Sequence, residues 1–310
     1  MLLQAEHIVK RYAGHTALND ISIDVPKQAI YGLLGPNGAG KTSLIRIINQ
    51  ITGPDSGRIL LNGRPISRED ISRIGYLPEE RGLYRKMKIG EQAMYLARLK
   101  GLSNHEAKKR LNEWFDRFEI QGWWNKKVEE LSKGMAQKVQ FITTVLHQPE
   151  LLILDEPFSG FDPINAELVK DEILRLRNEG ATVILSTHNM ASVEQICDKI
   201  ALINLSHKII EGNVKDIRES YRSFTYQIRF HGELLSFVNA LWTNFELVNK
   251  TTIDNEHICT VKLQQGKTVN DLLSSVIPVC QVQEIKEVIP GMNEIFIKAV
   301  QESTPEIKVA

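Results

Sequence analysis

The sequence has few features that would tie it directly to a membrane or to a structural metal. Its three cysteines, Cys197, Cys259 and Cys280, are scattered and lack the close cysteine or histidine spacing that a structural zinc site needs. We expect them to be reduced thiols in a cytosolic protein. No apolar run approaches the about 18 residues of a membrane span, and charged residues interrupt the start of the chain before a signal peptide could form. If the protein works at a membrane, another chain has to cross it.

Net charge is also missing, because 38 basic residues balance 38 acidic ones. This balance removes the long-range field of a dedicated nucleic-acid binder, so we expect no nucleic acid as a partner. The sequence has no internal repeat and no low-complexity segment. Its 42% apolar and 25% charged residues are typical of globular domains, which excludes a disordered or fibrous protein. The 310 residues suggest about two domains.

The first two thirds of the chain mix strand and helix patterns. Short strand-like segments separated by turn residues fill residues 2–34, and a glycine-rich loop and an apolar helix follow. Residues 88–118 favour helices, with a capping signal at Ser103 and Glu106. Beyond Pro149, apolar strands alternate with helices, and residues 199–212 have the pattern of a hairpin. The alternation predicts an α/β fold with a parallel sheet covered on both faces.

The pattern changes near Ser220. Seven short segments then follow in the order strand, helix, strand, strand, helix, strand, helix, and Thr268 with Asp271 forms a capping box. This order predicts a small α+β domain at residues 221–310, after a first domain at residues 1–220.

The strongest local signal is the G-x-x-x-x-G-K-[ST] phosphate loop at residues 35–42, between an apolar strand and an apolar helix. Glycines let backbone N–H groups surround the β-phosphate, and the helix points its positive end at it. Lys41 neutralises charge on the β- and γ-phosphates, and the Thr42 hydroxyl can ligate Mg²⁺. The candidate nucleotide-binding residues of this segment are Gly35, Asn37, Gly38, Ala39, Gly40, Lys41, Thr42 and Ser43.

A phosphate loop alone leaves kinases, GTPases and many ATPases open, so polar residues after other apolar strands become informative. The run at residues 151–154 ends in Asp155 and Glu156, which suits an aspartate in the Mg²⁺ shell and a glutamate aimed at the attacking water. His188 follows another apolar strand, and ligands bind at this end of such sheets. Each of these signals is common by itself.

Residues 131–138, LSKGMAQK, open a helix, and with them the sequence resembles the ATP-binding subunits of ABC transporters. The resemblance covers about residues 2–220. It implies that Ser132 and Gly134 belong to the signature motif, which contacts the γ-phosphate bound by the opposite subunit. It also implies that Asp162 lies in a loop at the dimer interface and that Tyr12 stacks on adenine.

The same resemblance implies a P-loop NTPase cassette with a mostly parallel core sheet, an antiparallel β subdomain and a helical subdomain at about residues 88–145. Such a subunit hydrolyses ATP with Mg²⁺ and pairs with a second ATP-binding subunit, identical or not. It powers a separate transmembrane permease, which holds it on the cytoplasmic face of the cell membrane. The groove that receives the permease would lie beside the Glu79 segment, with Leu83, Tyr84, Met87 and Ile89 as apolar contacts.

One departure from the family pattern concerns the metal. Glu79 stands where most of the family has the glutamine that meets Mg²⁺ and water. We therefore predict Thr42, Asp155 and Glu79 as metal ligands, with Glu156 and His188 as the catalytic residues. In the signature motif, Lys133 and Met135 replace the commonest glycine and glutamine.

The stretch EERGLY at residues 79–84 and the added C-terminal domain resemble a bacterial subgroup of sodium-extrusion and drug-export ATPases. This favours an exporter of ions or small molecules. Two alternatives are a soluble ABC-type ATPase of translation or DNA maintenance and a regulatory subunit with little turnover. A single cassette without a long coiled coil disfavours the first, and the presence of Glu156 and His188 disfavours the second.

Overall fold

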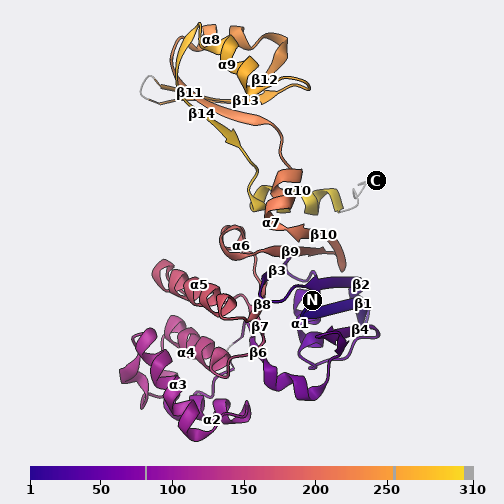
Figure 1. The fold of residues 1–310 in the computed structure, drawn as a ribbon, viewed down its shortest axis with the longest axis vertical. Coiled ribbons are helices and arrows are strands. Elements are labelled where there is room, and N and C mark those ends of the chain that lie inside the picture. Colours follow the sequence, from indigo (N-terminus) through magenta and orange to yellow (C-terminus); the bar gives the residue numbers. More distant parts are fainter. Residues whose placement is uncertain (81, 254–255, 304–310) are drawn as a thin grey trace. The chain divides into compact units, whose positions relative to one another are not determined.

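The structure is a computed structural model that describes residues 1–80, 82–253 and 256–303, without the side chain at position 243. Its backbone divides into two compact units, which are described separately (Figure 1). The first runs from Met1 to Val214 and takes up the chain again from Phe296, and the second comprises Lys215–Ile295. Among the described residues, no helix is both long and apolar enough to cross a membrane.

A six-stranded sheet forms the centre of the first unit, in the order β10-β9-β3-β8-β7-β6. All neighbouring strands are parallel except the edge pair of β9 and β10, which forms the predicted hairpin. Every residue of β3, β7 and β8 is buried, which explains why their sequences are continuous apolar runs. The strands are β3 (Ile30–Leu34), β6 (Ile74–Leu77), β7 (Leu151–Asp155), β8 (Thr182–Ser186), β9 (Lys199–Asn204) and β10 (His207–Asn213).

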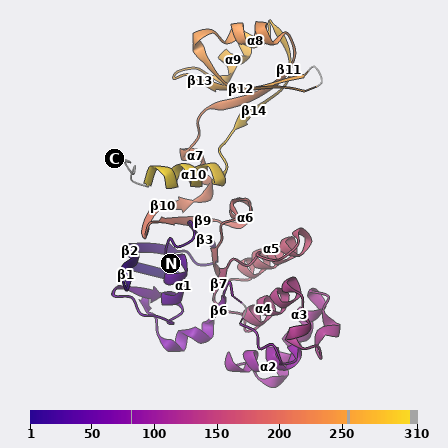
Figure 2. The same cartoon turned by 180° about the vertical axis from the view of Figure 1, so that it is seen from behind.

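A second, antiparallel sheet in the order β2-β1-β4-β5 packs in the same unit. Helix α1 (Lys41–Ile48) lies between the two sheets in both views of the ribbon (Figures 1 and 2). One hydrophobic cluster joins all three, with Ile23 from the antiparallel sheet, Leu44 from α1 and Ile153 from the main sheet. The strands are β1 (Leu3–Tyr12), β2 (His15–Val25), β4 (Ser56–Leu61) and β5 (Arg64–Pro65), and a 3₁₀ helix, Arg68–Arg73, precedes β6.

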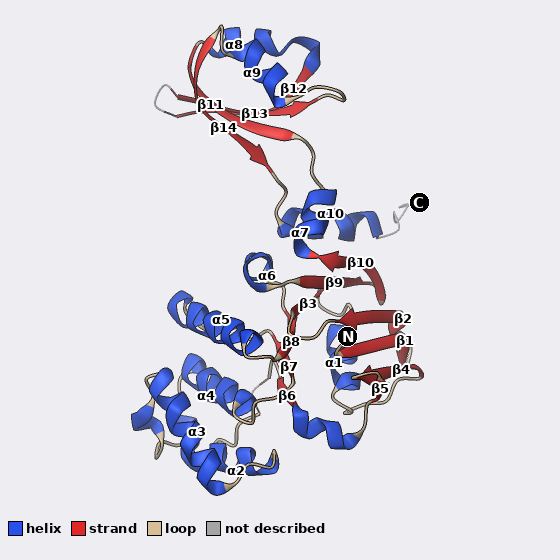
Figure 3. Ribbon diagram, viewed as in Figure 1, coloured by secondary structure: helices blue, strands red, loops and turns tan. Residues whose placement is uncertain are grey.

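The helices between β6 and β9 lie on the side of the central sheet that faces away from the antiparallel sheet (Figure 3). The predicted capping residue Ser103 accepts a hydrogen bond from the Glu106 backbone N–H, at 3.2 Å. Asp162 and Asn189 cap two further helices in the same way. The helices are α2 (Ile89–Leu99), α3 (Asn104–Arg117), α4 (Lys133–Val145), α5 (Pro163–Asn178) and α6 (Met190–Ile196), with short 3₁₀ turns at Gln121–Trp123 and Val128–Glu130.

An aromatic cluster holds α3 and α4 together, with the rings of Trp114, Phe118 and Phe141 about 6 Å apart. Trp114 also lies against α5, where the Arg175 guanidinium is 5.2 Å from its ring. The buried Glu172 carboxylate of α5 binds Arg175 at 2.7 Å and Arg117 of α3 at 3.0 Å. This combined packing and ion pairing fixes α3 to α5.

The second unit is an antiparallel sheet in the order β12-β13-β11-β14 with two helices packed on one core. Phe230 of the sheet stacks on Phe237 of α8, with ring centroids 4.2 Å apart. The predicted capping box is present, since Thr268 Oγ1 accepts a hydrogen bond from the Asp271 backbone N–H. The elements are β11 (Thr225–Gly232), α8 (Leu234–Leu241), β12 (Phe245–Ile253), β13 (Glu256–Leu263), α9 (Val269–Val276) and β14 (Cys280–Val288), with a 3₁₀ turn at Trp242–Asn244.

Two helices, α7 (Val214–Ser220) and α10 (Met292–Ser303), lie at the ends of the second unit's segment. From Ser220 onward the observed order of elements is the predicted one: strand, helix, strand, strand, helix, strand, helix. The predicted fold class is confirmed: a mostly parallel core sheet with antiparallel and helical parts, followed by an α+β domain.

A glycine in α2 gives a test of packing in the helical part. A Cβ added at Gly90 would lie 2.4 Å from the Trp124 ring, and the other packing of that ring, with its centroid 5.8 Å from that of Phe115, limits how far it can move away. We expect Gly90→Ala to lower the free energy of unfolding by about 1–3 kcal/mol, measured by urea denaturation. Gly122→Ala is the control, since its Cβ would meet nothing within 4 Å. Equal stability of the two variants would contradict the packing described here.

Candidate nucleotide site

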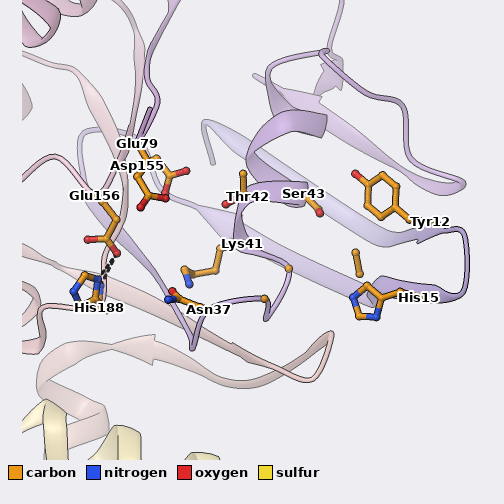
Figure 4. A pocket seen from close by; sticks show the side chains of 13 residues that line it. Tyr12, His15, Asn37, Lys41, Thr42, Ser43, Glu79, Asp155, Glu156 and His188 are labelled. Atoms are coloured by element: carbon orange, nitrogen blue, oxygen red, sulfur yellow. Dashed lines mark hydrogen bonds and ion pairs between the residues drawn. The ribbon is translucent and has the colours of Figure 1, made fainter. Parts of the chain in front are cut away.

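A cavity of about 420 Å³ lies at the carboxyl ends of the central parallel strands, beside the loop that follows β3 (Figure 4). It brings together residues from distant parts of the chain. The predicted site residues that line it are Tyr12, Asn37, Gly38, Gly40, Lys41, Thr42, Ser43, Glu79, Asp155, Glu156 and His188.

The loop between β3 and α1 forms one wall of the cavity. Gly40 precedes the first residue of α1 in the left-handed conformation, with φ 113°. A Cβ at Gly40 would lie 2.3 Å from the Ala17 carbonyl oxygen, so both its backbone angle and its surroundings require glycine. Since the first N–H groups of a helix have no partner within the helix, the start of α1 offers donors and a positive dipole to an anion.

Lys41 is the first residue of α1, and its side chain folds back over the loop. Its Nζ donates hydrogen bonds to the carbonyl oxygens of Gly35, at 2.8 Å, and Pro36, at 3.1 Å. Burial lowers the pKa of Lys41, whereas the nearby carboxylates of Glu156, Asp155 and Glu79 raise it. The Lys41 ammonium thus lies between the phosphate loop and these three carboxylates.

Three carboxylates face the loop from the other side of the cavity (Figure 4). Asp155 ends β7 and is 4% exposed, and burial raises its pKa, with the charges of Glu79 and Glu156 acting in the same direction. Glu79 follows β6, the neighbour of β7 in the sheet. A buried carboxylate, an exposed carboxylate and the Thr42 hydroxyl are the oxygen donors that Mg²⁺ prefers, so this set of residues fits the ion.

Glu156 is held by donors from the segment after β8. Its carboxylate accepts hydrogen bonds from the Thr187 hydroxyl at 3.2 Å and from the His188 backbone N–H at 3.0 Å. The His188 ring contacts it as well, with Nδ1 2.7 Å from Oε1. Glu156 has a left-handed backbone, φ 49°, which is rare for a residue with a side chain and costs of order 1–3 kcal/mol. This geometry orients the carboxylate toward the cavity.

The turn between β1 and β2 forms the far end of the cavity (Figure 4). Tyr12 ends β1 and is 42% exposed as a residue, so its ring is accessible to a flat partner. His15 and Ala17 of β2 also line the cavity, although sequence reasoning did not select them. The feature of the sequence that could have identified them as cavity residues is their position, three and five residues after Tyr12.

Five predicted site residues do not line this cavity. Gly35 lies against the Ile203 backbone and Ala39 is buried in the core. Ser132 Oγ caps α4 by accepting from the Met135 N–H, and Asp162 caps α5 by accepting from the Asn165 N–H. A Cβ at Gly134 would lie 3.4 Å from the Gly160 carbonyl oxygen, so the start of α4 and the loop before α5 are neighbours.

A second concavity, of about 350 Å³, lies beside β6 and is largely apolar. Leu83 lines it, together with the exposed residues Ile51 and Leu99, whereas the predicted contacts Met87 and Ile89 do not. Tyr84 is 58% exposed and does not line it, and Arg81 lies outside the described residues. We call this concavity the apolar groove. Its other lining residues are Asn49, Ile71, Ile74, Gly75, Tyr76, Pro78, Gly82, Leu96, Lys100, Gln140, Thr143, Thr144 and His147.

Comparison with known proteins shows to which family the chain belongs. The ABC transporter family matches residues 18–159, and a family described as "ATP-binding protein DrrA1-3-like, C-terminal domain" matches residues 212–300. The chain belongs to the ATP-binding subunits of ABC transporters, which hydrolyse ATP to power transport and work with membrane permease components. The predicted family and activity are therefore confirmed.

Individual relatives agree with this assignment. The chain is 47% identical over 220 residues to the uncharacterized ABC transporter ATP-binding protein YhaQ of Bacillus subtilis, covering 71% of this chain and 74% of YhaQ. It is 36% identical over 219 residues to the linearmycin resistance ATP-binding protein LnrL of the same species, covering 70% of each chain. A solved ATP-binding subunit of an ABC transporter, 30% identical, covers 71% of this chain and is itself 93% covered, with a TM-score of 0.67.

His147 is expected to make the stability of the first unit depend on pH. Its ring lines the apolar groove, and burial, together with the charge of Lys100, lowers its pKa to about 4. An unfolded histidine takes up a proton near pH 6.5, so stability is lost as the pH falls from about 6.5 to about 4. We expect this loss to be about 3 kcal/mol larger in the wild type than in His147→Gln, measured by urea denaturation followed by tryptophan fluorescence.

The matched control for this measurement is His105→Gln, because His105 is exposed on α3. This variant should lose stability in acid as the wild type does. Identical acid profiles for the wild type and His147→Gln would show that His147 does not contribute.

Proposed function

We propose that this chain binds and hydrolyses MgATP in the 420 Å³ cavity and drives a membrane permease that exports small molecules. The observation that carries the proposal is the convergence, in one cavity, of the phosphate loop with the carboxylates of Asp155 and Glu156. In this proposal residues 1–220 are the ATP-hydrolysing cassette and residues 221–310 are an accessory domain. The relative named for linearmycin resistance supports a small-molecule cargo.

Binding of ATP would use both ends of the cavity. The exposed Tyr12 ring can stack on adenine, while the N–H groups at the start of α1 and the Lys41 ammonium meet the phosphates. Thr42, Asp155 and Glu79 would hold Mg²⁺, which supplies charge neutralisation to the β- and γ-phosphates. The remaining phosphate-binding residues are Gly35, Asn37, Gly38, Ala39, Gly40 and Ser43.

Hydrolysis would proceed by attack of water on the γ-phosphorus with loss of ADP. Glu156 orients the water and accepts its proton, because three hydrogen-bond donors fix its carboxylate at the cavity. His188, 73% exposed in its side chain, can contact the γ-phosphate once nucleotide is bound. Most of the rate gain comes from positioning and electrostatics, since phosphoryl transfer offers little covalent chemistry to the protein.

A second ATP-binding subunit would complete each site. Ser132, Gly134 and Asp162 lie together outside the cavity, at the starts of α4 and α5. In a dimer they would supply helix N-termini to the nucleotide of the other subunit. Closure of the dimer on ATP and its opening after hydrolysis would transmit force to the permease.

The apolar groove is the surface that we assign to the permease. It carries exposed leucine and isoleucine side chains next to the segment after β6, which also bears Glu79. Pro78 lines the groove and the next residue, Glu79, lines the nucleotide cavity, so a permease segment seated in the groove would be linked to the nucleotide through these two residues. The permease, in turn, would hold this chain at the inner face of the cell membrane.

The central experiment uses Glu156→Gln. We expect this variant to bind ATP, to lose at least 90% of its turnover and to accumulate as a closed dimer, because the amide cannot accept the proton of water. ATP hydrolysis and size-exclusion chromatography with ATP measure these effects. The control is Glu246→Gln, which makes the same change at an exposed residue of β12. Turnover near the wild-type rate in Glu156→Gln would exclude the assigned role.

The tagged Glu156→Gln protein also identifies the partner. Purified from detergent-solubilised native membranes with ATP present, it should bring a polytopic membrane protein at equal stoichiometry. Recovery of ribosomes, or of no membrane protein, would favour the soluble ABC-type ATPase instead.

The groove assignment predicts the effect of a charge placed in it. Leu99→Glu should abolish copurification of the permease while leaving ATP binding unchanged, because an apolar contact cannot accept an unpaired carboxylate. Leu235→Glu is the matched control, since Leu235 and Leu99 are 64% and 65% exposed and Leu235 lies in the second unit. Equal recovery of the permease with both variants would refute the assignment.

A further inference from the structure

The cavity carries an excess of negative charge before any nucleotide enters. Among the described residues that line it, three side chains are carboxylates, namely Glu79, Asp155 and Glu156, and one is an ammonium, that of Lys41. His188 lies against Glu156 and His15 lies at the far end, near Tyr12 (Figure 4). A triphosphate is itself strongly anionic, so its entry without a cation is opposed by this lining.

Glu79 is the carboxylate whose role in this balance can be separated from the others. Asp155 is buried at the end of β7, and Glu156 is bound by Thr187 and His188, so both have structural contacts. Glu79 is exposed and follows β6, and its carboxylate points to the same side of the cavity as that of Asp155 (Figure 4). Its charge acts on both Asp155 and Lys41.

We infer that Glu79 makes nucleotide binding conditional on a divalent cation, so that the site takes the metal complex and rejects the free triphosphate. This inference rests on the proposed function and adds a selectivity to it. The carboxylate repels the phosphate oxygens when no cation is present and attracts the divalent cation when one is present. A glutamine would keep an oxygen ligand but lose both effects of the charge.

The size of the effect follows from Coulomb's law. At several ångströms and an effective dielectric between those of a protein surface and water, removal of one charge changes binding of an anion about tenfold. The complex of ATP with a divalent cation carries less net negative charge than free ATP. When the Glu79 charge is removed, the complex loses repulsion from its phosphates but also loses attraction to its metal, and the two effects offset each other. The charge therefore affects the free triphosphate more than the metal complex.

The experiment measures binding and not turnover. The dissociation constant of ATPγS is determined by isothermal titration calorimetry, once with excess Mg²⁺ and once with EDTA. We expect Glu79→Gln to lower the dissociation constant in EDTA about tenfold and to change that in Mg²⁺ less than about threefold. The ratio of the dissociation constant in EDTA to that in Mg²⁺ is therefore expected to be almost ten times smaller in this variant than in the wild type.

Two further variants make the test specific to charge at this position. Glu80→Gln removes the same charge from the next, exposed residue, which does not line the cavity, and should leave the ratio within about twofold of the wild type. Glu79→Asp keeps the charge and should retain the wild-type ratio within about threefold. Equal melting temperatures of all variants would show that the fold is unchanged.

The outcomes separate this inference from the proposed function. Wild-type binding of Mg-ATPγS with no change of the ratio in Glu79→Gln overturns the inference and leaves the proposed function intact. An equal change in Glu80→Gln also overturns it, because the effect would then be one of net charge alone. Absence of wild-type binding under both conditions overturns the proposed function and the inference with it.

Discussion

Parallel pairing of β3, β7 and β8 is the constraint on which the site depends. The register sets Leu154 beside Leu185 and Asp155 beside Ser186, and β3 continues the same edge through its pairing with β8. Since parallel strands end at one edge, the phosphate loop, the two acids and the segment with His188 emerge together. The buried apolar strands hold this edge rigid, which allows an exposed histidine and a strained Glu156 backbone to keep a defined geometry.

In the cavity, burial and the attraction between opposite charges shift the pKa values of the same groups in opposite directions. Burial lowers the pKa of Lys41 and raises that of Asp155, and proximity of the two groups acts against both shifts. The described lining carries three carboxylates and one ammonium, so its negative charge is not fully balanced by the protein. A cation would supply the missing positive charge, and this inference follows from the charges of the side chains alone.

Caps at helix starts show how one residue can serve structure and a proposed function at once. Ser132 and Asp162 satisfy backbone N–H groups of α4 and α5 in the single chain. The structural role alone explains a serine and an aspartate at these positions. Their proposed role in a dimer depends on a second subunit, which the fold of one chain does not contain.

The sequence by itself determined the local elements and the phosphate loop. Continuous apolar runs gave the buried strands, the capping signals at Ser103 and Thr268 gave helix starts, and the glycine spacing gave the loop, because these signals act between residues close in the chain. Only the tertiary structure decided that His15 and Ala17 join the cavity, that Gly40 is pressed against the Ala17 carbonyl, and that His147 faces the apolar groove. These contacts join residues far apart in the chain or depend on how a turn is oriented, and no short-range pattern records such distances.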